Sequence, residues 1–310
     1  MLRRTIEFST AGTRLSVANR QLVVERPEQP RATLPIEDLG VVIVDDGRAT
    51  YTQAVFVELL AAGATIMITG RDHLPMGMML PLDAHHVLTE RHRAQVKVTE
   101  PTRKRVWQAL VRAKIAQQAT VLQHFRGEHG GLLPMARRVR SGDPDNLEAQ
   151  AAQRYWPALF GPAFLRDRDA AGVNAVLNYG YAVMRAAIAR AVVAAGLIPT
   201  LGVFHRHRAN PFCLADDLLE PYRPFVDWRV RTLANEAGPQ GPALEVRAVR
   251  AGLLSLLAET VLVRQRRNPM LLAIEASAAS LARALTGEGV DLALPEGLPF
   301  AEGVDDEAGS

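Results

Sequence analysis

The hydrophobic pattern of this chain changes its period between Asp83 and Glu100, and this change restricts the fold more than any other feature. Before it, apolar residues alternate with polar neighbours in short runs, at the period of two that is typical of half-buried strands. The alternating pairs are Ile6 and Phe8, Leu15 and Val17, and Leu22 and Val24. After Pro101 the chain consists of longer segments rich in Ala, Leu, Arg and Gln, which predict helices. The sequence therefore predicts an α+β fold, with a small β-rich domain followed by a larger all-α domain.

Turn and helix-breaking residues set the expected boundaries of these parts. We expect the β-rich domain over residues 1–88, a linker over 89–100, the helical domain over 101–286 and a loosely ordered tail over 287–310. Helices are expected at 51–62, 102–124, 170–195, 244–264 and 269–285. A further helix carries Glu148, with Asp145 or Asn146 as its N-cap. No glycine-rich fingerprint follows a predicted strand, so the sequence does not support Rossmann or P-loop nucleotide binding.

Composition excludes several classes of protein. A hydrophobic content of 48% and a charged content of 22% are those of an ordinary globular protein. The single cysteine, Cys213, excludes a disulfide framework and fits a reducing compartment. No apolar run approaches the roughly 18 residues that a membrane span needs. We therefore expect a cytoplasmic protein without a membrane partner.

Positive charge is concentrated in one part of the chain. The formal net charge is only +3, yet the fifty residues from Arg91 to Arg140 hold twelve Lys and Arg against two acids. Such a run can present a basic face to a polyphosphate. It also fits an ordinary solvated helical surface, and the two interpretations stay open at this point.

The stretch from Gly202 to Phe225 carries the most specific candidate chemistry. His205 lies in a predicted loop, and Asp217 and Glu220 follow three residues apart, on one face of a predicted helix. One imidazole and two carboxylates are suitable ligands for a hard divalent cation. Pro221 disfavours the helical conformation at Glu220, so we expect the helix to kink there.

A further ligand should come from a distant part of the chain, and Glu148 is the candidate. It stands among small residues on a helix that is expected to face the core. The alternative is a buried ion pair with Arg154 or Arg185. A lone histidine such as His205 is likewise often a satisfied polar residue, and we expect Asp216 to turn away from the site.

These motifs together resemble one family. NLEAQAA around Glu148, NYGYAVMR at 178–185, GVFHRH at 202–207 and LADDLLEPYRP at 214–224 are similar to the CRISPR-associated integrase called Cas-one, in the version found beside the type II effector. The resemblance covers nearly the whole chain. It implies that Glu148, His205 and Glu220 hold a catalytic Mg²⁺ or Mn²⁺, with Asp217 assisting through water.

The resemblance also implies a reaction and partners. The expected activity is that of a metal-dependent DNA endonuclease and integrase, which inserts captured DNA fragments into the CRISPR repeat array by attack of a 3′-hydroxyl on a phosphodiester. The expected partners are double-stranded DNA, a second copy of the chain, a Cas-two protein in a heterohexameric complex, and type II effector proteins. The arginines expected to contact DNA are Arg137, Arg138, Arg140, Arg206 and Arg208. Arg206 and Arg208 depart from the family pattern, in which neutral polar residues often stand there.

Two alternatives remain at this stage. One is a catalytically silent DNA-binding scaffold of the same complex. The other is a metal-independent hydrolase that uses Glu148 and Glu220 as an acid–base pair. If His205 is a ligand, its imidazole must be neutral, so we expect activity to fall below about pH 6, near the ordinary histidine pKa.

Overall fold

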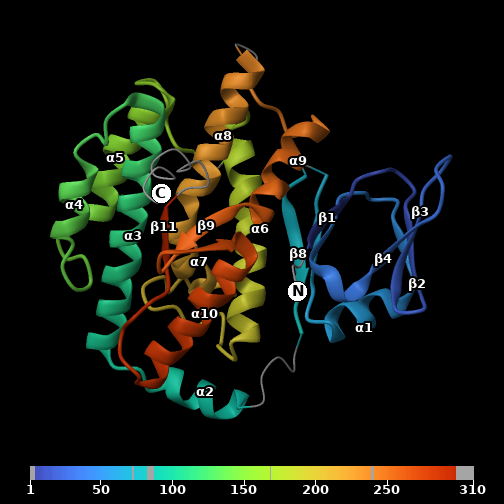
Figure 1. Ribbon diagram of the computed structural model, residues 1–310, viewed down its shortest axis with the longest axis horizontal. Coiled ribbons are helices and arrows are strands. Elements are labelled where there is room, and N and C mark those ends of the chain that lie inside the picture. The colour runs from blue at the N-terminus through green and yellow to red at the C-terminus, as the bar shows by residue number, and fades with distance from the viewer. Residues whose placement is uncertain (1–3, 72, 82–86, 168, 239–240, 298–310) are drawn as a thin grey trace, which may run out of the picture.

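The computed structural model describes residues 4–71, 73–81, 87–167, 169–238 and 241–297. Its N-terminal part contains two four-stranded sheets, at the right of Figure 1. The first has the order β4-β3-β2-β6, and the second has the order β1-β5-β7-β8. Their strands are β1 (Arg4–Phe8), β2 (Arg14–Ala18), β3 (Gln21–Glu25), β4 (Ala32–Pro35), β5 (Leu39–Val44), β6 (Thr50–Tyr51), β7 (Thr65–Thr69) and β8 (Pro75–Met79). A 3₁₀ turn η1 (Ile36–Asp38) and the helix α1 (Gln53–Ala61) complete this part.

Strand β5 joins the two halves of the molecule. All six of its residues are buried, and it pairs in parallel with β1 and β7. Because successive side chains of a strand point to opposite faces, Val42 and Val44 pack in the N-terminal core, whereas Val41 and Ile43 pack in the core of the helical part. A fully apolar strand is therefore required here, since both faces of its sheet are covered.

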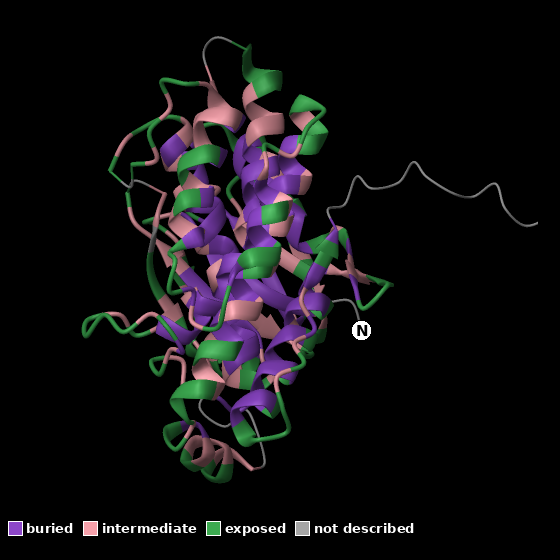
Figure 2. Ribbon diagram, turned by 90° about the vertical axis from the view of Figure 1, so that its left-hand side faces the viewer, coloured by how far each residue is buried: buried purple, intermediate pink, exposed green. Residues whose placement is uncertain are grey.

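The C-terminal part is mainly helical. Its helices are α2 (Leu88–Val96), α3 (Glu100–Arg126), α4 (Leu132–Arg138), α5 (Leu147–Phe160), α6 (Val173–Ala194), α7 (Cys213–Leu219), α8 (Arg223–Ala237), α9 (Arg247–Ser255) and α10 (Met270–Thr286). Short 3₁₀ turns η2 (Glu220–Tyr222) and η4 (Leu256–Ala258) lie between them. Helix α6 is buried along most of its length and runs through the middle of this part (Figures 1 and 2). An apolar surface all round a helix is what such a central position requires.

The α+β fold is confirmed, but the second part is not all-α. A three-stranded sheet of order β10-β9-β11 lies within it, formed by β9 (Thr260–Val263), β10 (Arg266–Pro269) and β11 (Pro295–Gly297). The helix expected at 244–264 was wrong at its C-terminal end, because α9 and η4 stop at Ala258 and a hairpin follows. Arg264 and Gln265 both have positive φ, 51° and 60°, as a tight hairpin turn requires.

Two other segments differ from the sequence-based boundaries. The expected linker 89–100 contains most of helix α2. Part of the expected loose tail is ordered, because β11 pairs with β9 and the Pro295 carbonyl accepts a hydrogen bond from Gln117 of α3. The rest of that expected tail, 298–310, lies outside the described residues. Among the helices that are described, none is long and apolar enough to cross a membrane.

Candidate metal centre

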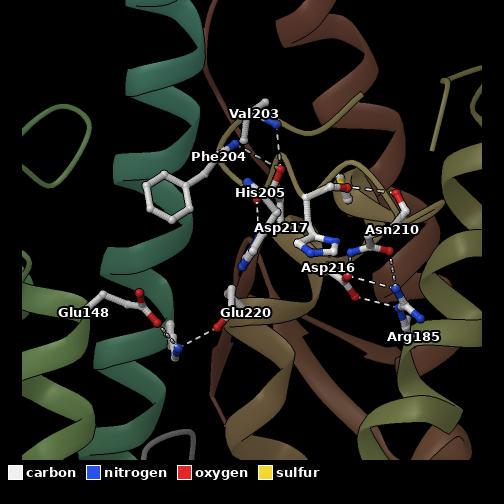
Figure 3. Close-up of polar contacts among 12 residues, drawn as sticks. Glu148, Arg185, Val203, Phe204, His205, Asn210, Asp216, Asp217 and Glu220 are labelled. Atoms are coloured by element: carbon white, nitrogen blue, oxygen red, sulfur yellow. Dashed lines mark hydrogen bonds and ion pairs between the residues drawn. The ribbon is translucent and has the colours of Figure 1, made fainter. Parts of the chain in front are cut away.

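Glu148, His205 and Glu220 line one cavity of about 270 Å³ in the helical part. They come from three separate elements: α5, the loop before α7, and the 3₁₀ turn after α7. Figure 3 shows Glu148 approaching from one side and Glu220 and His205 from the other. The other residues that line the cavity are Lys114, Gln118, Ala152, Trp156, Arg166, Tyr181, Arg223 and Asp227. The tertiary structure thus brings the three sequence-predicted ligands to one site.

Helix α5 presents Glu148 from its first turn. Asn146 is the N-cap residue, as expected, but its side chain makes no capping hydrogen bond. Asp143 supplies the cap instead: its carboxylate accepts from the backbone N–H of Leu147 (2.9 Å) and of Glu148 (3.0 Å). Asn146 adopts a left-handed conformation, with φ 51°, which turns the chain so that the earlier aspartate can reach the helix end. A cap of this kind fixes the first turn and therefore the direction of the Glu148 side chain.

Glu220 lies where α7 ends and η2 begins. Contrary to expectation, Pro221 does not move Glu220 out of the helical region, because Glu220 has φ −53° and ψ −48°, but the α-helix does end at this residue. The chain instead tightens into a 3₁₀ turn at Glu220–Tyr222 and re-enters α-helix at Arg223. A proline is tolerated at the first positions of a helix, where its missing N–H has no intrahelical acceptor to lose. The change of helix type places the buried Glu220 carboxylate against α3.

Asp217 holds the histidine loop (Figure 3). Its Oδ2 accepts from the backbone N–H of Val203 (2.6 Å) and Phe204 (3.2 Å). Its Oδ1 accepts from the backbone N–H of His205 (3.0 Å) and from the ring Nδ1 of His205 (2.7 Å). Since Asp217 is fully buried and accepts four hydrogen bonds, it orients the imidazole and leaves Nε2 as the nitrogen able to bind a metal.

Gly202 permits this close packing. A Cβ at this position would lie 2.4 Å from the His205 carbonyl oxygen and 2.7 Å from Asp217 Oδ2. Phe204 of the same loop packs against helix α3: its ring stacks on that of Trp107, with centroids 4.0 Å apart. The loop is therefore fixed from both sides.

The pKa values of Asp217 and His205 are both raised. The hydrogen bond to Asp217 raises the pKa of His205, although partial burial acts the other way. Burial raises the pKa of Asp217, and its hydrogen bonds to His205 and Phe204 oppose that rise. All four groups bonded to Asp217 are N–H donors, so the arrangement serves an ionised carboxylate.

Two basic side chains contact the glutamates. The ammonium of Lys114, on α3, contacts Glu148 Oε1 and lies 2.5 Å from Glu220 Oε2. Arg223 Nε donates to Glu220 Oε1 at 2.9 Å. Burial alone would raise the pKa of Glu220, but Arg223 and Lys114 outweigh it and lower the pKa to about 2. Burial alone would lower the pKa of Lys114, and the two glutamates more than compensate, so it rises.

The donor set fits a divalent cation. Two carboxylates already converge on one positive charge, and an oriented imidazole lines the same cavity. In the structure as it stands, no three His, Cys, Asp or Glu side chains among the described residues are gathered closely enough to ligate a metal ion. Carboxylate oxygens suit Mg²⁺ and Mn²⁺, and an imidazole suits Mn²⁺ better than Mg²⁺.

Comparisons with known proteins decide the family. The model of the family "CRISPR associated protein Cas1" matches residues 8–242. A CRISPR-associated endonuclease Cas1 from Neisseria meningitidis serogroup C is 36% identical over 294 residues, which is 94% of this chain and 95% of that protein. This chain belongs to the Cas1 family.

Solved structures show the same fold at lower identity. A casposase bound to its integration product aligns with a TM-score of 0.77 at 18% identity, over 94% of this chain and 92% of that chain. A Cas6-RT-Cas1–Cas2 complex aligns with a TM-score of 0.73 at 17% identity, over 94% of this chain and 36% of that chain. The Cas1-family assignment confirms the sequence-based resemblance.

Other candidate residues of this Cas1-family chain lie outside the cavity. Asp216 turns away from Asp217, as expected, and forms a two-point ion pair with Arg185 at 2.6 and 2.9 Å (Figure 3). Arg185 is therefore not the partner of Glu148, and neither is Arg154, because that role belongs to Lys114.

The arginines expected to contact DNA fall into two groups. Arg206 and Arg208 line a cavity of about 620 Å³ together with Arg103, and His205 lines both this cavity and the candidate metal cavity. Arg137 and Arg138 are exposed at the end of α4. Arg140 is exposed too, but its guanidinium is paired with Asp145 at 2.7 and 3.0 Å.

Sequence reasoning missed Lys114 and Arg223. The available signal for Lys114 was KIAQQ, which places a lysine and two glutamines on the buried side of a long helix. Arg223 follows Glu220 by three residues, a spacing at which side chains on a helix meet. Asp227 was also missed: it accepts from Tyr155 at 3.1 Å and from Tyr181, and burial raises its pKa to about 7.

Proposed function

We propose that this Cas1-family protein is a divalent-metal-dependent DNA endonuclease and integrase of CRISPR adaptation. The observation that carries the proposal is the pair of glutamates, Glu220 buried and Glu148 half-buried, that contact one ammonium group beside an imidazole oriented by Asp217. The proposed reaction joins the 3′-hydroxyl of a captured DNA fragment to a phosphodiester of the CRISPR repeat. A new P–O bond forms to the attacking oxygen, and the bond to the leaving 3′-oxygen breaks.

In this proposal Glu148, His205 and Glu220 would hold Mg²⁺ or Mn²⁺. When bound, the cation stabilises negative charge on the scissile phosphate and lowers the pKa of an attacking hydroxyl or water. Arg223 holds Glu220 ionised, and Asp217 fixes the tautomer in which the His205 Nε2 lone pair is free. Asp217 thus positions a ligand and does not itself assist through water, because its oxygens are occupied by N–H donors.

The charges around Glu220 restrict the acid–base alternative. A metal-independent pair would need one carboxyl group protonated near neutral pH. Arg223 and Lys114 lower the pKa of Glu220 to about 2, so Glu220 would be the base of such a pair and Glu148 would have to be its acid. Joining that continues in the presence of a chelator would revive this alternative.

The proposed partners follow from family membership and charge. We propose double-stranded DNA, held without sequence recognition by the exposed arginines at 137, 138, 206 and 208. We also propose a homodimer that assembles with a Cas2 protein, since a Cas1–Cas2 complex is among the structures that share this fold. Contact with type II effector proteins belongs to the same proposal.

Joining of a short duplex to a supercoiled plasmid that carries a repeat tests this function. The reaction contains the Cas2 partner and Mn²⁺, and compares wild type with His205→Ala and Glu220→Ala. A matched control is Glu236→Ala, which removes an exposed carboxylate from α8. We expect wild type and the control to join, and both site variants to bind DNA without joining.

Other outcomes would change the proposal. If the site variants join as well as wild type, the cavity is structural and the mechanism is wrong. If wild type binds DNA but joins nothing under any metal, the protein is the silent scaffold instead.

A further inference from the structure

Lys114 occupies the point at which the two candidate ligand carboxylates converge. It comes from α3, whereas Glu148 comes from α5 and Glu220 from η2, so three elements meet at one ammonium group. Only 9% of the Lys114 side chain is exposed. Arg223 pairs with Glu220 differently, through the other carboxylate oxygen at 2.9 Å. The bridging position therefore belongs to Lys114.

The Glu220 carboxylate is buried and the Glu148 carboxylate is 26% exposed, and the two repel each other unless a cation lies between them. Removal of one partner from a buried ion pair leaves an uncompensated charge, which is strongly destabilising. Lys114 supplies that charge from within the chain and keeps both glutamates at the same place. A divalent cation would use the same oxygens at shorter distances, about 2.0–2.1 Å for Mg²⁺. An ammonium and a metal ion cannot both occupy this point.

We propose that Lys114 is the resident counter-cation of the metal centre: it holds Glu148 and Glu220 together without metal and is displaced when a divalent cation binds. The inference rests on the metal-dependent function proposed above. Arg223 keeps its own oxygen of Glu220 and does not need to move. Because Lys114 is tethered to α3, its displaced charge stays at the cavity wall, where it repels the metal and attracts a phosphate.

Titration of Mn²⁺ into metal-free full-length protein, followed by the electron spin resonance of free Mn²⁺, tests the competition. The variants are Lys114→Met and a matched control, Lys104→Met, which removes an exposed lysine paired with Glu100 on the same helix. We expect Lys114→Met to bind Mn²⁺ about tenfold more tightly than wild type, since a like charge close to the site is removed. We expect Lys104→Met to stay within about twofold, as screened surface charges do. Equal or weaker binding by Lys114→Met would overturn the inference.

A second readout uses wild-type protein alone, because Lys114→Met leaves the carboxylates of Glu148 and Glu220 face to face without a shared cation. Lysines are acetylated briefly with acetic anhydride, with and without Mg²⁺, and the peptides are quantified by mass spectrometry. Displacement predicts that Mg²⁺ speeds labelling of Lys114 several-fold and leaves Lys104 unchanged. Unchanged or slower labelling of Lys114 would contradict displacement.

The two proposals fail in different ways. If wild type shows no saturable Mn²⁺ binding, or if Glu148→Gln leaves that binding unchanged, the metal centre itself is wrong. If wild type binds Mn²⁺ and Glu148→Gln abolishes it, but Lys114→Met brings no gain, the role of Lys114 alone is wrong.

Discussion

Two clusters of ionisable side chains, both within the part of the chain that the structure describes, differ in their basic partners and in their exposure. The first is the metal cavity, with Lys114, Glu148, Glu220 and Arg223. The second, which we call the interdomain cluster, comprises Glu7 on β1, Asp45 after β5, His73 and Arg250 on α9. Arg250 Nε lies 2.8 Å from Glu7 Oε1 and 3.4 Å from Asp45 Oδ2, and His73 Nδ1 lies 2.8 Å from Asp45 Oδ2.

Both clusters pair two carboxylates with two basic groups, and the first lines a cavity. In the interdomain cluster the side chains of Glu7, Asp45 and Arg250 are 6%, 1% and 6% exposed, and His73 at its edge is 31% exposed. In the metal cavity Glu148 is 26% exposed, and its partner is a flexible lysine. Arginine holds two acceptors in a fixed planar geometry, whereas a lysine ammonium is a point charge on a flexible stem. An arginine thus joins the N-terminal part to the helical part in the interdomain cluster, whereas a lysine lies at the cavity where we propose that a metal ion replaces it.

We expect the largest effect from a substitution that lowers activity but hardly changes stability. Glu148→Gln should lower the joining rate by about 10³-fold, because several kcal/mol of transition-state stabilisation are lost with a metal ligand. The melting temperature should change little, since Lys114 keeps Glu220 as a partner. Gel-based joining assays and calorimetric melting check the two parts, and a joining rate near wild type would contradict the assignment.

In the interdomain cluster we expect a substitution to lower stability and to leave metal binding unchanged. Arg250→Met should destabilise the protein by about 3–5 kcal/mol, because two buried carboxylates lose their shared cation. The affinity of the folded protein for Mn²⁺ should stay within about twofold, since the cluster shares no residue with the cavity lining. Thermal melting and Mn²⁺ titration measure both. A normal melting temperature would show that this cluster contributes little.

Asp217→Asn should weaken Mn²⁺ binding by about 10- to 100-fold, as loss of a residue that orients a ligand does. An amide nitrogen cannot accept the hydrogen bonds that one carboxylate oxygen receives, so part of the histidine loop would lose its acceptor. Mn²⁺ titration at constant pH measures the effect. Unchanged affinity would mean that the loop is held by other contacts.

The pH dependence follows from the raised pKa of His205. Metal binding needs the neutral imidazole, so affinity should fall as pH decreases, and the raised pKa of His205 should move that fall to a higher pH than the ordinary histidine pKa would give. In the metal-free protein the His205–Asp217 pair contributes stability below pH 6.5, and that contribution is lost as pH rises through the raised pKa. Mn²⁺ titrations and melting curves from pH 5 to 9 measure both trends. The midpoint should move down in Asp217→Asn, and a midpoint that does not move would contradict the coupling.

The smallest effects concern DNA. Arg137→Ala and Arg138→Ala should each reduce the slope of log affinity against log salt by about 1, the change expected when one phosphate contact is lost. Arg140→Ala should change it less, because its charge is already paired with Asp145. Fluorescence anisotropy with a labelled duplex at several salt concentrations measures the slopes. If all three variants had the same slope as wild type, these arginines would not contact DNA.

Much of the fold followed from local pattern. The buried run of β5, the helices α1, α3, α6 and α10, and the change from strands to helices near residue 100 were all predicted from periodicity. The hairpin of β9 and β10 was not, because TVLV fits a buried helix as well as a strand. Antiparallel pairing with β11, which lies some thirty residues later in the chain, stabilises this segment as a strand.

The sequence by itself determined which groups can carry the chemistry: Glu148, His205, Asp217 and Glu220 were identified from residue type and motif. The tertiary structure decided what each of them touches. It placed Asp217 where its carboxylate hydrogen-bonds to His205, and it placed Lys114 between the two glutamates. The physical reason is distance along the chain. Asp217 reaches His205 within one loop and one helix, whereas Lys114, Glu148 and Glu220 lie on separate elements that meet only when α3 packs against α5 and η2.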